Sequence, residues 1–219
     1  MRSSSPALAV LLALAASAAV QAQANPVNDT GIVFCRDHAS GADSNTTAAS
    51  NCTELPNHGA QDARYGRDAA AIKEVLVTST GKGFDYVKIS HSGAELPASA
   101  APGNGPDDWG CTYDKHTGLL WEIKVDEPGH LRSMNHTYTW YFSGNTHGGP
   151  GVADTVGAGG VCLTDGRCDT EKFVADVNAA GLCGKNDWRV PTIKELYNLV
   201  DRGRESPAIH PSFFPNTPS

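Results

Sequence analysis

Six cysteines are the residues of this chain whose chemistry is easiest to define. All of them follow the N-terminal apolar stretch, and an even number in an exported chain favours disulfides. Six cysteines allow fifteen pairings. From their order along the chain we predict the pairs Cys35–Cys52, Cys162–Cys168 and Cys111–Cys183. Zinc is disfavoured because the paired Cys-x-x-Cys and His-x-x-x-His spacings do not occur.

Histidines and acidic pairs provide weaker metal chemistry. His130, His136 and His147 lie in or beside a loop-rich region and could meet at a metal, but they lack the helical i, i+4 spacing, so solvated loop histidines are favoured. The pairs Asp107-Asp108 and Asp126-Glu127 carry oxygens of the kind that calcium prefers. No calcium-loop pattern accompanies them, so surface acids are favoured. We therefore predict no metal and no cofactor.

Catalytic patterns are also missing from the sequence. No serine lies in a Gly-x-Ser-x-Gly motif, and residue order alone defines no Ser, His and Asp arrangement. The chain carries 17 Lys and Arg against 24 Asp and Glu, without a basic cluster. Affinity for nucleic acids and sulfated glycans comes from counterion release by clustered Lys and Arg, so neither partner is expected. We predict a protein that is not an enzyme.

The N-terminus has the features of a secretory signal over residues 1–24. Arg2 gives the positive start, Ala7–Val20 the apolar run and Ala22-Gln23-Ala24 the cleavage site. The run is too short and too rich in alanine for a transmembrane helix. Residues 25–83 are polar and poor in large apolar side chains, which predicts a loop-rich segment. We expect an exported protein that is periplasmic, surface-bound or secreted.

Short strands are predicted after this segment. Alternation over Phe84–Ile89 indicates one strand, and Trp109–Asp114 with Leu119–Lys124 indicates a hairpin around Lys115–Gly118. Trp121 is expected to point into the core. Thr137–Phe142 indicates a further strand, and the glycine-rich residues 143–168 indicate a long loop.

Two helices are predicted to bracket a turn. Asp169 or Thr170 can cap a helix that runs through Ala180, with Phe173, Val174 and Val177 buried and Gly181 at its end. Thr192 and Glu195 have the spacing of a capping box. The second helix is expected to bury Ile193, Leu196, Leu199 and Val200 in one stripe and to stop at Gly203. Trp188, before this helix, is predicted to be a core anchor.

Several ordered motifs resemble the Lcl C-terminal domain family. The pattern that carries the resemblance is Gly-Leu-Cys-Gly-x-x-Asp-Trp-Arg-Val-Pro-Thr-x-x-Glu-Leu, over Gly181–Leu196. Agreement extends to Trp109-Gly110-Cys111, Asp114, Thr117–Glu122, Thr137–Tyr141 and Phe173–Asn178. The residues that form this structural signature are Trp121, Asp187, Trp188, Arg189, Pro191, Thr192 and Glu195.

The resemblance and the predicted elements together indicate an α+β domain over residues 84–219. The family has C-type-lectin-like relatives, which implies a mixed or antiparallel sheet with two helices and long loops. Family members continue past a Phe-Pro-Asn-Thr stretch, whereas this sequence stops at Pro215–Ser219. We therefore expect a fragment that lacks the C-terminal part of the domain.

The resemblance implies a scaffold that presents loops to a ligand rather than a known reaction. The favoured hypothesis is an exported bacterial binding or adhesion module for a carbohydrate or protein ligand. The alternative is a structural domain of an envelope assembly. A third hypothesis is an enzyme like the formylglycine-generating oxidases, with Cys162 and Cys168 as a redox or copper-binding pair. The Glu-Pro-Asn and Gln-Pro-Asp tripeptides of calcium-dependent lectins are missing, and Glu127-Pro128-Gly129 matches them only in part.

Overall fold

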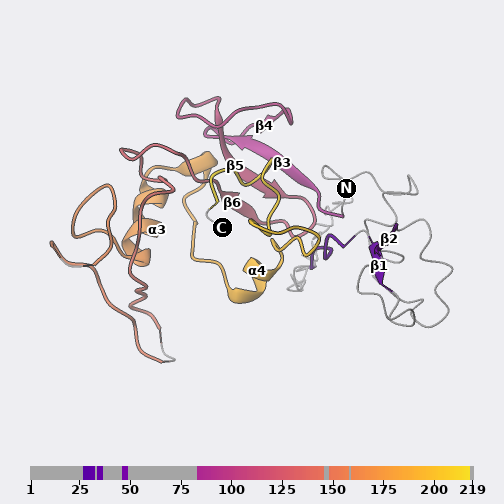
Figure 1. Cartoon of the computed structure of the whole chain (residues 1–219). Helices are drawn as coiled ribbons and strands as arrows, with labels where there is room; N and C mark the ends of the chain where they lie inside the picture. Colours follow the sequence, from indigo (N-terminus) through magenta and orange to yellow (C-terminus); the bar gives the residue numbers. More distant parts are fainter. Residues whose placement is uncertain are drawn as a thin grey trace, which may run out of the picture.

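The computed structural model describes residues 27–32, 34–36, 46–48, 83–145, 148–157 and 159–217 (Figure 1). The predicted signal at residues 1–24 and most of the segment 25–83 lie outside the described residues. Cys52 does too, so the Cys35–Cys52 prediction stays untested. Two short strands of this segment, β1 Phe34–Arg36 and β2 Thr46–Ala48, pair antiparallel.

The centre of the domain is a four-strand antiparallel sheet of order β4-β3-β5-β6. Its strands are β3 Tyr86–Ser90, β4 Glu95–Leu96, β5 Trp109–Asp114 and β6 Leu120–Glu122. Tyr86 is opposite Asp114 in the β3–β5 pair, and Tyr113 is opposite Leu120 in the β5–β6 pair. The predicted hairpin and first strand are confirmed. β6 lies at one edge of the sheet, and its neighbour in the sheet is β5.

Each face of the sheet packs on a separate apolar cluster, because strand side chains alternate between the two faces. On one face Ile89 and Cys111 pack with Val177, Leu182 and Cys183. Val87, Tyr113, Leu120, Leu131, Phe173 and Trp188 are half-buried around this cluster. This face is therefore covered by the first helix and the turn after it.

The other face is covered by the C-terminal segment, which is yellow in Figure 1. Phe84 and Tyr86 pack there with Phe213 and Phe214, and Trp121 borders the cluster. The Thr112 hydroxyl donates to the Phe213 carbonyl oxygen over 2.6 Å. One buried hydrogen bond therefore fixes residues 213–214 on the central strand.

The predicted strand Thr137–Phe142 is wrong. The segment forms only isolated bridges, Thr139 with Asp169 and Tyr141 with Gly151. Its backbone bonds go to loop residues instead: the Thr137 N–H donates to the Val161 oxygen and the Phe142 N–H to the Pro150 oxygen. A β-strand needs a continuous row of hydrogen bonds to a neighbouring strand, and residues 137–142 have only isolated bridges.

The first predicted helix is confirmed as α3, Thr170–Ala179. The Asp169 side chain accepts the Lys172 N–H over 2.8 Å and caps its start. Val177 is buried in the first cluster, whereas Phe173 and Val174 are half-buried. Gly181 follows with φ of 61°, a left-handed conformation that favours glycine, and leads into the 3-10 turn η2, Leu182–Gly184.

The second predicted helix is much shorter than expected. α4 spans only Ile193–Tyr197, and its predicted buried stripe is wrong because Ile193 is 72% exposed and Leu196 is 47% exposed. The chain after Tyr197 bonds to the N-terminal segment instead of continuing the helix. The Asn28 side chain donates to the Asn198 carbonyl, and the Arg202 N–H donates to the Thr30 carbonyl.

Gly203 has a different role from the helix stop that the sequence predicted. A Cβ atom at this position would lie 2.3 Å from the Gly31 carbonyl oxygen. Glycine therefore permits a close approach between two segments far apart in the chain.

Within the described part of residues 84–219, a four-strand sheet, two α-helices and long connections make the domain α+β, as predicted. Among the described residues, none of the helices has the length and apolar character needed to cross a bilayer. Two of the three predicted disulfides are confirmed, Cys111–Cys183 and Cys162–Cys168.

The two disulfides should differ in their effect on stability. Their sequence separations are 72 and 6 residues. In the chain-entropy model, removing the disulfide that closes the longer loop lowers the free energy of unfolding by about 4 kcal/mol. Removing the disulfide that closes the shorter loop lowers it by about 2 kcal/mol. We expect Cys111→Ala with Cys183→Ala to lower the free energy of unfolding in urea by more than Cys162→Ala with Cys168→Ala, and equal losses would contradict this.

Candidate functional site

A groove of about 690 Å³ lies between β6, α3 and the segment that leads into α4. One wall is formed by Leu119–Glu122, and Phe173 and Val174 of α3 form the second. The third comes from Trp188–Pro191 with Leu196 and Leu199. Most of the lining is apolar or aromatic, with charged side chains among it. Concave apolar sites with few polar groups are typical of ligand pockets.

Trp188 is the fixed part of the third wall. Its indole Nε1–H donates to the Leu182 carbonyl over 3.1 Å, and its backbone N–H donates to the Asn178 side chain over 2.7 Å. The Asn178 amide returns a bond to the Trp188 carbonyl. The half-buried ring packs against the first cluster. Trp188 is the predicted anchor, and it also lines the groove.

The turn after Trp188 is held by an ion pair and the predicted capping box. Glu195 accepts the Thr192 N–H over 2.7 Å, and Thr192 accepts the Glu195 N–H over 3.3 Å. Arg189 binds the same carboxylate with two nitrogens, at 2.9 and 2.5 Å. The Arg189 hydrogen bonds, with those from Thr192, lower the pKa of Glu195 to about 2. This rim charge is thus satisfied within the protein.

Glu122 differs because burial opposes the charge on its carboxylate. Burial raises the pKa of Glu122 despite an ion pair with Lys124 at 3.2 Å. The Lys124 ammonium also lies 4.7 Å from the centre of the Phe173 ring. Burial, with the charges of Glu122 and Asp176, raises the pKa of Tyr138 to about 12, and the neutral hydroxyl donates to the Leu131 carbonyl over 3.2 Å.

Two neighbouring residues of the groove hold polar atoms without a partner. The Trp121 Nε1–H and the Glu122 Oε1 atom are buried and make no hydrogen bond to any residue that the structure describes. Both residues line the groove. An unpaired buried polar group costs about 1–3 kcal/mol, so each needs an explanation. A bound ligand with one acceptor and one donor would satisfy both.

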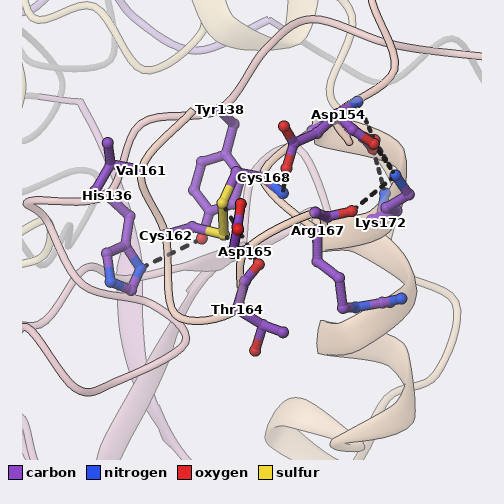
Figure 2. Close-up of a disulfide and its surroundings, with 12 residues drawn as sticks. His136, Tyr138, Asp154, Val161, Cys162, Thr164, Asp165, Arg167, Cys168 and Lys172 are labelled. Carbon is purple, nitrogen blue, oxygen red and sulfur yellow. Dashed lines mark hydrogen bonds and ion pairs between the residues drawn. A yellow bond between two sulfur atoms is a disulfide. The ribbon is translucent and has the colours of Figure 1, made fainter. Parts of the chain in front are cut away.

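The second disulfide joins Cys162 and Cys168 of the long loop, just before α3 (Figure 2). The Asp154 carboxylate accepts the Cys168 N–H over 2.6 Å, and Asp169 accepts the Asp154 N–H over 3.0 Å. Lys172 reaches the carbonyls of Asp154 and Gly166. Asp154, Asp169 and Cys168 are buried. The disulfide therefore belongs to a local network that fixes the start of α3.

The histidines and acidic pairs of the metal hypotheses make ordinary hydrogen bonds. His130 Nδ1 accepts the Arg132 N–H, and His136 Nε2 is 3.0 Å from the Pro128 oxygen. His147 lies outside the described residues. Glu127 accepts a bond from Asn104, and Asp126 one from Asn135. Within the part of the chain that the structure describes, no three His, Cys, Asp or Glu residues gather as a metal site.

The family model of the Lcl C-terminal domain matches residues 110–219. The chain belongs to the Lcl C-terminal domain family. The match starts within β5, so β3 and β4 precede it, although β3 pairs with β5 in the same sheet. The domain boundary at residue 84 stays a prediction. Neither a curated protein nor a solved structure matches the chain significantly.

The signature residues of this Lcl C-terminal domain gather around one groove. Trp121, Asp187, Trp188, Arg189, Pro191 and Glu195 line it, and Thr192 caps the adjacent helix. Sequence analysis missed Glu122, Tyr138 and Leu120 as groove residues. The alternation of the hairpin could have placed Leu120 and Glu122 on one face, but no local pattern indicates that α3 and Tyr138 lie beside them.

Stability should fall as acid protonates Glu195. The ordinary pKa is 4.5 and the folded value is about 2, so the stabilisation is complete above pH 4.5 and is lost as pH falls towards 2. We expect Glu195→Gln to remove this part of the acid-dependent decline in the free energy of unfolding. Glu205→Gln, at an exposed position outside the turn, is the control. Identical pH profiles for the parent and Glu195→Gln would contradict this role.

Proposed function

We propose that this Lcl C-terminal domain is an exported, non-catalytic module that binds a carbohydrate or protein ligand in the groove between β6, α3 and α4. The observation that carries the proposal is the pair of buried, unpartnered atoms at Trp121 and Glu122. A ligand with one acceptor and one donor would compensate for both.

Exposed apolar side chains at the rim support binding. Leu196 and Val190 line the groove and are 47% and 36% exposed. When a ligand covers exposed apolar surface in a concave site, the free energy of binding becomes more favourable by about 25 cal/mol per Å² of surface removed from water. Arg189 and Glu195 neutralise each other in an ion pair. At this part of the rim the surface offered to a ligand is therefore mainly apolar.

Export is supported by the N-terminal signal pattern and by the two disulfides, which persist in oxidising compartments. A non-catalytic role fits a groove in which two of the three lining carboxylates, Glu122 and Glu195, each pair with a cation. Adhesion is one use of such a module. The alternative is a structural role in an envelope assembly, and in that case we expect no saturable binding of a small ligand.

Two matched variants on α4 test the proposal. Leu196 lines the groove and Ile193 does not, although both are exposed apolar residues of the same short helix. Binding of the chain to a glycan array and a peptide library identifies a ligand, and calorimetry measures it. We expect Leu196→Gln to weaken binding at least about tenfold, as the loss of a leucine side chain that the ligand covers implies, and Ile193→Gln to leave it unchanged.

The absence of saturable binding to either library would overturn the proposed function. Equal effects of the two variants would overturn the location of the site.

A further inference from the structure

His91 contacts two separate loops through a single ring nitrogen. The residue follows β3, and its Nε2 atom lies 2.9 Å from the Gly103 carbonyl oxygen and 3.0 Å from the Arg132 Nη2 atom. Gly103 belongs to the loop before β5, and Arg132 belongs to the turn after β6. A Cβ atom on Gly110 would lie 2.7 Å from the imidazole ring, so the glycine leaves the space that His91 occupies.

The two contacts of this nitrogen require opposite proton states. A carbonyl oxygen only accepts, so the Gly103 contact needs a proton on Nε2. A guanidinium only donates and stays charged, so the Arg132 contact needs a free lone pair on the same atom. The proton on Nε2 therefore decides which of the two loops His91 binds.

The guanidinium of Arg132 depends more on this acceptor than the Gly103 carbonyl depends on a donor. Arg132 is 1% exposed, and within the part of the chain that the structure describes no carboxylate forms an ion pair with it. Its Nη1 atom donates to the Gly110 and Ile123 carbonyls, over 3.1 and 2.5 Å. A buried donor that loses its acceptor costs more free energy than a half-buried carbonyl that water can reach. We therefore expect neutral His91 to accept from Arg132 and to carry its proton on Nδ1.

We propose that His91 is a pH-sensitive switch, which holds the turn 126–133 through Arg132 when neutral and releases it in favour of Gly103 when protonated. The protonated ring carries a proton on both nitrogens, so it donates to Gly103 and offers Arg132 no acceptor. Two positive charges then lie side by side. The Asp108 carboxylate, which accepts the Gly105 N–H, belongs to the Gly103 loop and attracts the charged ring to that side.

The charges around His91 set the direction of the pH response. Burial and the positive charge of Arg132 lower the pKa of His91, against the Gly103 hydrogen bond and the charge of Asp108. Its ordinary pKa is 6.5, so below this pH the unfolded chain binds a proton more readily than the folded chain does. The contact with Arg132 therefore contributes fully to stability above pH 6.5 and loses this contribution as the pH falls below it.

His130 is a second titratable residue in the same turn. Its Nδ1 atom accepts the Arg132 backbone N–H over 3.1 Å, so protonation of this ring also removes a bond from Arg132. Burial and the charges of Arg132, His91 and His136 lower the pKa of His130, and the charge of Glu127 opposes them. An experiment on the switch has to separate the two histidines.

The turn 126–133 contacts the centre of the domain. Leu131 packs on the first cluster, and its carbonyl accepts the Tyr138 hydroxyl over 3.2 Å. The centre of the Tyr138 ring lies 4.8 Å from the centre of the Phe173 ring of α3. A turn that Arg132 no longer holds would therefore loosen a contact with α3.

Nitrogen-15 NMR of the histidine rings in the parent chain tests the proton positions, and it needs no variant. The ring shifts at pH 8 report the tautomer, and a titration reports the pKa of each histidine. We expect neutral His91 to carry its proton on Nδ1 and to have a pKa below 6.5. A proton on Nε2 at pH 8 would overturn the contact with Arg132, and a pKa of 6.5 or above would overturn the switch.

Hydrogen exchange of the turn tests its release. The Val125 N–H donates to the Arg132 carbonyl over 3.1 Å, so its exchange reports whether the turn is held. After correction for the intrinsic effect of pH on exchange, we expect its protection to fall at least about fivefold between pH 7.5 and pH 5.0. Unchanged protection would overturn the proposal.

His91→Gln should remove the proton dependence, because a glutamine amide has both an acceptor and a donor. The amide can accept from Arg132 and donate to Gly103 at every pH, so we expect protection of the Val125 N–H to change less than about twofold. His116→Gln is the matched control, since the His116 ring contacts the Val27 carbonyl instead, and it should respond to pH as the parent does.

His130→Asn separates the second histidine, because an asparagine side chain keeps an acceptor and does not titrate. We expect this variant to retain the loss of protection that the parent shows. A full response in His91→Gln together with no response in His130→Asn would assign the switch to His130 and overturn the role of His91.

Discussion

The disulfide between Cys111 and Cys183 is the constraint on which the rest of the domain depends. Cys111 lies in the central strand β5, and Cys183 lies in the turn after α3. Both are buried in the same cluster as Val177 and Leu182. One covalent bond therefore sets the distance between sheet and helix. Hydrogen bonds to Leu182 and Asn178 fix Trp188 relative to this turn. Trp188 in turn fixes one wall of the groove.

The two glutamates on opposite sides of the groove have different surroundings and opposite pKa shifts. On the α4 side, Glu195 has bonds from Arg189 and Thr192 and a pKa of about 2. On the β6 side, Glu122 is half-buried, its buried Oε1 atom has no partner among the described residues, and burial raises its pKa. The first arrangement stabilises a turn whether or not a ligand is bound. The second leaves a buried acceptor unsatisfied, which costs free energy.

The sequence predicted the local features well and the long-range ones poorly. The capping box, the hairpin and the cap at Asp169 depend on residues within a few positions, so spacing alone indicates them. The strand at 137–142 failed because its alternation is not matched by a neighbouring strand. α4 ended early because residues 28–30 compete for its continuation, which no local pattern reports. The groove combines β6, α3 and the Trp188 turn, and only the tertiary fold brings them together.

The network around Asp154 has a consequence for how the surface of this protein can diversify. Asp154, Cys168 and Asp169 close the base of the long loop independently of the groove, and Val156 and Val161, between those fixed points, are mostly exposed. Substitution of these two exposed side chains should therefore change the surface of the loop while the network at its base keeps the start of α3 in place.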